Sequence, residues 1–269
     1  MAKSVLPRGR ARLAAVLQVA GDLVTIADAE RELALPRVPA AKLLSRWVDQ
    51  GWVRRVGTGT YVPVPLDLLA SEQVVQDPWI LVPALFSPAY IGGRTAAEHW
   101  DLTEQIFRDT VVFTARPLRQ KHVERQGAVF TIKHVHEDKI FGTKTVWRGR
   151  TRVDVSDVHR TVIDMLDDPA VGGGIQHVAD CFSRYVKRSD YDPEKLIEYA
   201  DRYGNGAIFK RLGFLAEREG EERMLANAAK ARLTKGNAKL DPGLACDRLV
   251  TRWRLRVPPS WYEGGTDDR

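Results

Sequence analysis

The first 64 residues contain three helical patterns followed by two short β patterns around a glycine-rich turn. The helical patterns cover residues 8–20, 25–33 and about 39–50, and the β patterns cover residues 52–56 and 60–64. The turn between the two β patterns is Gly57-Thr58-Gly59, whose glycines permit a tight hairpin. Three helices followed by a hairpin is the element order of a winged helix-turn-helix, which we therefore predict for residues 1–64.

Short polar residues, glycines and prolines mark the ends of these helices. Gly21 ends the first helix, and Thr25 can cap the second one. Pro36 stops the second helix, and Pro39 suits the first turn of the third. Gly51 then closes the third helix. The turn between the second and third helices is therefore short, as in a helix-turn-helix.

The third helix would present a polar face to DNA. If its apolar residues Leu43, Leu44, Trp47 and Val48 face inward, then Lys42, Ser45 and Arg46 face outward. Arginine and lysine can neutralise phosphates, and arginine can also read guanine through paired hydrogen bonds. The expected DNA-binding residues are Arg37, Lys42, Ser45, Arg46, Arg54, Arg55, Thr58 and Tyr61. Alternatively, the polar residues of the third helix form an ordinary solvated face without DNA contact. Tyr61 could likewise pack beneath the hairpin instead of contacting DNA.

Positive charge is concentrated toward the two ends of the sequence. Residues 1–65 carry 10 Lys and Arg against 5 Asp and Glu, whereas residues 66–229 carry 22 against 25. Residues 230–256 carry 8 against 2. Clustered positive charge is typical of a surface that binds a polyanion such as DNA.

The basic terminal segments offer additional contacts. Arg8 and Arg10 could form a minor-groove arm, or simply part of a solubilising terminus. A strand over residues 252–256 would place Arg252, Arg254 and Arg256 on one face, where they could grip phosphates or an acidic protein partner. A charged edge strand that resists aggregation is the alternative.

Residues 65–235 are expected to form a mixed α/β domain with a small sheet and a helical half, followed by a basic extension over residues 236–269. A helical stretch near 65–86 and a short helix at 94–102 precede β-rich segments at 110–115, 128–135 and 145–155. Helices are predicted at 158–166, 175–186, 193–203 and 207–232. The overall fold class is therefore α+β.

The sequence contains no familiar catalytic motif. It has no phosphate-binding loop, no nucleophile elbow and no dinucleotide fingerprint, and we expect a protein that is not an enzyme and uses no cofactor or metal. An acidic run containing Asp154, Asp164, Asp167 and Asp168 leaves open a Mg²⁺-dependent enzyme that processes nucleic acids. His134 and His136 could share a strand face, but a metal site needs a further ligand.

Several stretches resemble AbiEi-type antitoxins of type IV toxin–antitoxin systems, which act in abortive infection as a phage defence. The similar stretches are residues 51–62, residues 87–102 (SPAYIGGRTAAEHWDL), Arg160–Asp164 with the glycines at 172–174, and residues 196–217. The stretch 98–102 departs in detail from the family pattern, and the basic segment after residue 230 lies outside the resemblance.

The resemblance implies an N-terminal winged helix and a C-terminal antitoxin domain. It implies a transcriptional repressor that binds promoter repeats of its own operon and counteracts a nucleotidyltransferase-like toxin, and that need not form a stable complex with this toxin. A ligand-sensing transcription factor without a toxin partner remains an alternative.

We expect a cytoplasmic protein without membrane association. The sequence shows no signal peptide and no apolar run long enough to span a bilayer. Cys181 and Cys246 fit no disulfide or zinc pattern, so we expect both to be reduced and buried.

Overall fold

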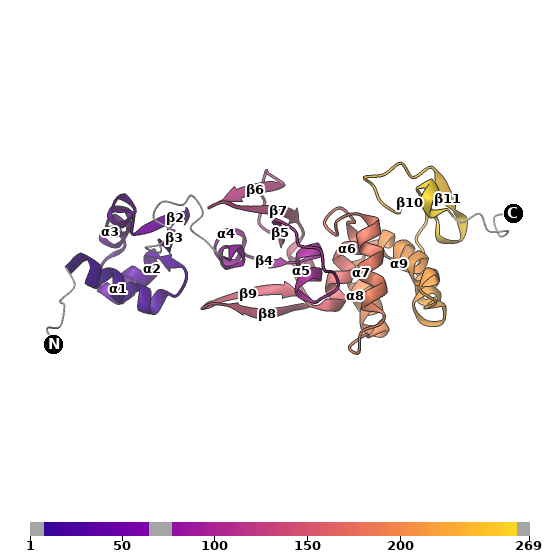
Figure 1. Ribbon diagram of the computed structural model, residues 1–269, viewed down its shortest axis with the longest axis horizontal. Helices are drawn as coiled ribbons and strands as arrows, with labels where there is room; N and C mark the ends of the chain where they lie inside the picture. The colour runs from indigo at the N-terminus through magenta and orange to yellow at the C-terminus, as the bar shows by residue number, and fades with distance from the viewer. Residues whose placement is uncertain (1–7, 65–76, 263–269) are drawn as a thin grey trace.

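The computed structural model describes residues 8–64 and 77–262, apart from the side chains of Glu222 and Arg223. It is an α+β structure with an elongated outline, in which the N-terminal helices, a large sheet and a helical half follow one another along the long axis (Figure 1). Within the described ranges, no helix combines the length and the apolar character needed to cross a membrane.

The N-terminal part consists of three helices and a three-stranded sheet. Its elements are α1 (Arg8–Ala20), β1 (Val24–Thr25), α2 (Ile26–Leu33), α3 (Arg37–Asp49), β2 (Val53–Gly57) and β3 (Thr60–Pro63). The strand order is β1-β3-β2, and both pairings are antiparallel. Val16, Leu44 and Trp47 belong to the buried cluster between the helices and this small sheet. The predicted three helices and hairpin therefore occur in the expected order.

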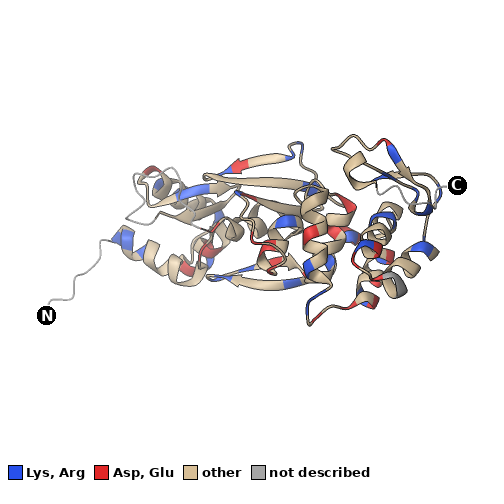
Figure 2. Cartoon of the chain, turned by 45° about the vertical axis from the view of Figure 1, so that its right-hand side comes forward, with Lys and Arg blue, Asp and Glu red and all other residues tan. Residues whose placement is uncertain are grey.

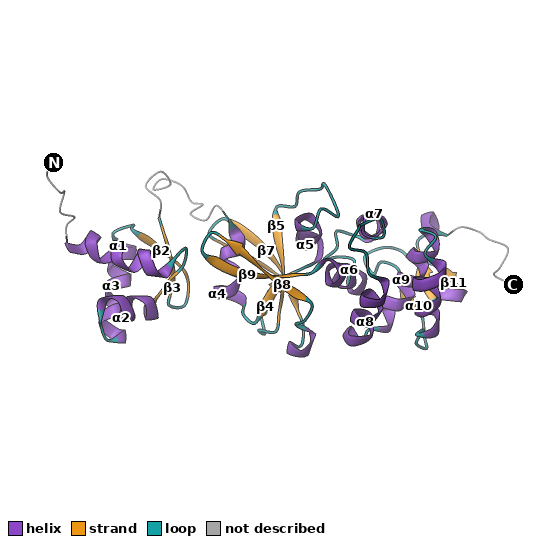
Figure 3. Ribbon diagram, turned by 90° about the horizontal axis from the view of Figure 1, so that it is seen from below, coloured by secondary structure: helices purple, strands orange, loops and turns teal. Residues whose placement is uncertain are grey.

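A six-stranded mixed sheet forms the middle of the molecule. Its strands and the short helices beside them are a 3₁₀ turn (Pro78–Leu81), α4 (Val82–Phe86), β4 (Ala89–Ile91), α5 (Gly93–His99), β5 (Asp109–Thr114), β6 (His122–Arg125), β7 (Ala128–His134), β8 (Thr143–Arg148) and β9 (Thr151–Ser156). The order is β6-β7-β5-β4-β9-β8, with parallel pairing in β5–β7 and β4–β9. Figure 3 shows the strands between the N-terminal helices and the helical half.

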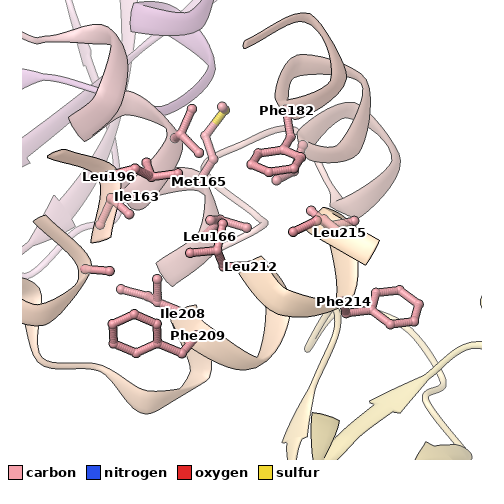
Figure 4. Close-up of a cluster of buried hydrophobic side chains, with 14 of the residues drawn as sticks. Ile163, Met165, Leu166, Phe182, Leu196, Ile208, Phe209, Leu212, Phe214 and Leu215 are labelled. Carbon is pink, nitrogen blue, oxygen red and sulfur yellow. The ribbon is translucent and has the colours of Figure 1, made fainter. Parts of the chain in front are cut away.

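The helical half contains α6 (Val158–Asp167), α7 (Ile175–Tyr185), α8 (Pro193–Tyr203), α9 (Gly206–Arg218) and α10 (Asn227–Ala231). Figure 4 shows side chains from these helices packed together, among them Ile163, Leu166, Phe182 and Leu212. The prediction of one continuous helix over 207–232 is wrong. Helix α9 ends at Arg218, Gly220 follows with a φ of 77°, and a π-helical turn precedes α10.

The C-terminal residues pack onto the helical half. Strands β10 (Ala238–Lys239), β11 (Arg248–Val250) and β12 (Leu255–Val257) form a small sheet. Trp253, only 1% exposed, lies in the same hydrophobic cluster as α6 and α9. The predicted strand over 252–256 is confirmed only at Leu255 and Arg256, because a 3₁₀ turn at Thr251–Trp253 and a left-handed Arg254 (φ 50°) separate β11 from β12.

Other predicted elements differ in their bounds. The helical stretch near 65–86 is described only from residue 77, where Pro78 and Pro83 start two short helices, and residues 65–76 lie outside the described residues. The segment 145–155 is a hairpin whose strands are joined at Gly149 and Arg150. Both cysteines are unpaired and buried, as predicted.

Hydrophobic and polar contacts attach the N-terminal part to the large sheet. Val56 and Val62 from the β2–β3 hairpin share a hydrophobic cluster with Leu81 and Phe86. On the other side, the backbone N–H of Arg150 donates to Asp22 Oδ2 at 2.6 Å. These contacts fix the orientation of the N-terminal helices relative to the sheet.

Candidate nucleic-acid interface

The sequence of α3 divides the helix into a buried and an exposed face. Ala40, Leu44 and Trp47 are at most 1% exposed and recur at helical spacing. Lys42 and Arg46, one helical turn apart, are exposed on the opposite face. The helix therefore presents a polar surface to solvent, as its sequence pattern predicts.

The exposed face of α3 is part of an open depression. Its lining residues are Ile26, Arg37, Val38, Ala41, Lys42, Ser45, Arg46 and Asp49. The structure thus brings together four predicted contact residues: Arg37, Lys42, Ser45 and Arg46. Val38 is 65% exposed and adds an apolar contact point that we did not predict. Asp49 is the only acid among these lining residues.

Local interactions define both ends of α2. Thr25 Oγ1 accepts from the backbone N–H of Asp28, and Asp28 Oδ2 accepts from the backbone N–H of Thr25, which completes a capping box. Ala34 ends α2 in a left-handed conformation with a φ of 49°. The Arg37 side chain is 74% exposed and lies 3.8 Å from Glu30. Arg37 is therefore accessible at the start of α3.

The β2–β3 hairpin lies beside this face. The backbone N–H of Ile26 donates to the carbonyl of Gly59 at 3.2 Å, which joins the hairpin turn to the start of α2. Arg55 and Thr58 are exposed, and Arg55 Nε donates to the Gly57 carbonyl at 3.2 Å. Arg54 is half-buried on β2. Both Figure 1 and Figure 3 show β2 and β3 between α3 and the large sheet.

Tyr61 does not belong to the exposed surface. Its side chain is 4% exposed and packs in the cluster that contains Val16 and Trp47. The prediction of a DNA contact at Tyr61 is therefore corrected, and the alternative of packing beneath the hairpin holds. The alternation of the strand explains this, since Tyr61 points toward the helices.

The basic termini do not form the surfaces that we predicted. Arg8 and Arg10 belong to the first turn of α1 rather than an extended arm, and the Arg10 guanidinium lies 5.8 Å from the centre of the Trp52 ring. Arg252 donates to Glu217 at 2.9 Å, and Arg254 donates to the Thr234 carbonyl at 3.0 Å. Arg256 is exposed on β12. The three C-terminal arginines therefore do not share one strand face.

The acidic residues considered for Mg²⁺ are engaged in separate contacts. Asp154 accepts from Thr145, whereas Asp167 accepts from Tyr203 and Asn205. Asp168 accepts from Lys133 at 2.6 Å. In the part of the chain that the structure describes, no group of three His, Cys, Asp or Glu residues could hold a metal ion.

Asp164 is part of a fully buried ion pair. Arg160 Nε donates to Asp164 Oδ1 at 2.8 Å, and Tyr90 bridges the two by accepting from Arg160 and donating to Asp164. Burial is the largest influence on Asp164 and raises its pKa to about 6, although Arg160 acts to lower it. The Arg160 guanidinium also lies 4.2 Å from the centre of the Phe141 ring. The arginine–aspartate motif therefore joins α6 to the sheet and does not face solvent.

A second group of basic residues was not predicted from the sequence. Arg116, Arg119, Lys121 and Arg125 are all exposed around β6, and the three arginines line a cleft together with residues of the β2–β3 hairpin. Four positive charges within ten residues are the signal that could have identified this segment. Figure 2 shows that basic residues are otherwise spread over the chain and interspersed with acidic ones.

Comparisons with known proteins bear on the fold alone. The chain resembles the crystal structure of the RV2827C protein from Mycobacterium tuberculosis, with a TM-score of 0.62 and 14% sequence identity. The similarity covers 95% of this chain and 93% of that one. No protein-family model matches the sequence, and the comparison with curated proteins gives no match. The similarity therefore supports a shared architecture over nearly the whole chain.

Proposed function

We propose that this protein is a DNA-binding transcriptional regulator whose N-terminal part acts as a winged helix-turn-helix. The observation that carries the proposal is the exposed face of α3, where Lys42, Ser45 and Arg46 line one open depression. In such a unit, the second helix of the motif enters the major groove and its outer side chains reach bases and phosphates.

The chemistry of the α3 face suits this role. Arg46 can donate two hydrogen bonds to a guanine edge, and Lys42, one turn earlier, can neutralise a phosphate. Ser45 can donate to a base or a phosphate oxygen. Arg37 lies at the start of the helix, the end that commonly approaches base edges. The α3 face therefore offers contacts to phosphates, which would position the protein on DNA, and contacts to bases, which would recognise the DNA sequence.

The hairpin supplies neighbouring contacts in this proposal. Arg55 and Thr58 are exposed on the hairpin, whose turn is joined to the start of α2, and they could contact the duplex backbone. Arg54 adds positive charge on the same hairpin. The contacts of Val56 with the large sheet hold the hairpin in place, so that these residues need little ordering when DNA binds.

The experiment is a fluorescence-anisotropy titration of promoter DNA with the intact protein and a double variant, Lys42→Glu with Arg46→Glu. Charge reversal at two contacts should weaken binding by at least about tenfold. Arg152→Glu is a control for charge reversal, because Arg152 is exposed on β9 and does not line the α3 depression. Equal affinities of the double variant and the intact protein would contradict the assignment of the DNA face.

We also propose antitoxin activity of the AbiEi type for the remainder of the chain. This part of the proposal rests on the resemblance of residues 87–102, 160–164 and 196–217 to that family. The test is co-expression with a nucleotidyltransferase-like toxin encoded next to this gene. Restored growth would support the antitoxin role, whereas unchanged toxicity at equal expression would favour a regulator without a toxin partner.

A further inference from the structure

A cleft of about 530 Å³ lies between the β2–β3 hairpin and the large sheet. Val56, Gly57 and Thr58 form one wall, and residues from α4, the β5–β6 connection and β6 form the other. Leu85 Cδ2 would lie 3.0 Å from a Cβ at Gly57, so the hairpin and α4 approach closely at the base of the cleft. Gln126 also donates across this boundary to the Arg55 carbonyl at 3.0 Å.

The cleft concentrates positive charge. Arg116, Arg119 and Arg125 line it, and none of the described residues that line it is Asp or Glu. Arg116 is held in place, because its Nη1 donates to the Leu85 carbonyl at 2.8 Å. Arg125 Nη1 donates to the carbonyl of Glu124 at 2.7 Å. Backbone carbonyls therefore orient two of the guanidinium groups without neutralising their charge. We call this site the arginine cleft.

The arginine cleft also contains apolar surface. Leu85 and Leu118 are partly exposed in its walls, and Phe86 and Val123 are buried beneath them. A DNA backbone could use the arginines but not the apolar walls. The exposed lining of the cleft is mostly polar, with apolar patches at Leu85 and Leu118. Concave sites of this size at the boundary between structural units are common places for small ligands.

We propose that the arginine cleft binds a small organic anion with an apolar body, such as a carboxylate or phosphate ester of an aromatic or aliphatic group. Arg119 and Arg125 bind the anionic group through charge-assisted hydrogen bonds. Leu85 and Leu118 pack against the apolar body. No covalent step is involved.

Occupancy of the arginine cleft would be coupled to the hairpin. Thr58 belongs both to the wall of the cleft and to the set of predicted DNA contacts. A ligand that shifts the hairpin changes DNA affinity, and by thermodynamic reciprocity DNA changes the affinity for the ligand. This consequence rests on the proposed function, whereas the binding site itself does not.

The test uses isothermal titration calorimetry of the full chain with phenyl phosphate and hexanoate as probes and benzyl alcohol as a neutral comparison. We expect saturable binding of at least one anionic probe and weaker binding of the alcohol. The double variant Arg119→Gln with Arg125→Gln should bind that probe at least about tenfold more weakly. Arg152→Gln, an exposed arginine outside the cleft, should bind it as the intact protein does. Circular dichroism of each variant checks that it is folded.

Equal binding of the anionic probes to the intact protein and the folded double variant would overturn the proposal. The proposal would also be overturned if the anionic probes did not bind and the double variant lost DNA affinity. In that case the arginines would bind DNA phosphates. Probe binding that depends on Arg119 and Arg125 in a protein that binds no DNA would support the cleft and contradict the proposed function.

Discussion

Arg160 and Asp164 lie one turn apart on α6 and form a 2.8 Å ion pair in which both side chains are fully buried. The pair contacts Tyr90 on β4, so it connects the helical half with the central strand of the sheet. A buried charge without its partner is costly, which makes this pair sensitive to the loss of either member.

Arg160→Met should lower the free energy of unfolding by about 3–5 kcal/mol, because Asp164 and Tyr90 lose their buried donor. Urea denaturation at neutral pH measures this change. Arg252→Gln is the control, since its ion pair with Glu217 is half-exposed and should contribute less than about 1 kcal/mol. Similar effects of the two substitutions would show that the buried pair has no special role.

Asp22→Ala should loosen the attachment of the N-terminal part to the sheet. Asp22 accepts from the Arg150 backbone N–H at 2.6 Å and from Thr151 Oγ1 at 3.1 Å. Hydrogen exchange at the Arg150 amide should become at least about tenfold faster, as expected for a lost hydrogen bond to a charged group. Unchanged protection of that amide would indicate that the attachment depends on the hydrophobic contacts alone.

Gly213→Ala should destabilise the C-terminal sheet. A Cβ at this position of α9 would overlap the ring of Trp253, which is buried against the helix. The expected loss is about 1–3 kcal/mol from overpacking. Combining Gly213→Ala with Trp253→Leu should cost less than the two single effects added together, because the smaller side chain leaves room for the methyl group. Additive effects in thermal unfolding would contradict this packing.

The contribution of His159 to stability should fall as the pH decreases from about 7 to about 5, whereas the raised pKa of Asp164 acts in the opposite direction. Burial lowers the pKa of His159 below its usual value, and the ring accepts or donates a 2.8 Å hydrogen bond with Tyr185. The unfolded chain therefore takes up this proton at a higher pH than the folded chain, and stability is lost as the pH falls below the usual histidine pKa. Urea denaturation should show a smaller loss in His159→Gln than in the exposed control His134→Gln.

Elements with strong local signals were predictable from the sequence. The capping residue Thr25, the helix-ending Gly21 and the proline at 193 define α1, α2 and α8 within a residue or two. The exposed face of α3 follows from the spacing of Leu44 and Trp47. In each case the determining interactions lie within a few residues of one another.

Features that depend on distant residues were not predictable in the same way. Strand β4 has only three residues, and its pairing of Ile91 with Val155 cannot be inferred from local periodicity. The turn at Arg254 directly follows Trp253, which packs against Gly213 on α9, far away in the sequence. Tyr61 and the arginine cleft likewise depend on how the hairpin meets the rest of the chain.

The most direct test of the central claim is binding of the purified protein to its own promoter DNA, compared with scrambled DNA of equal length, at two salt concentrations. The account predicts tighter binding to the promoter and weaker binding at the higher salt concentration, because phosphate contacts release counterions. Equal, weak binding to both DNA molecules would contradict a sequence-specific regulator and leave the α3 face as a solvated surface.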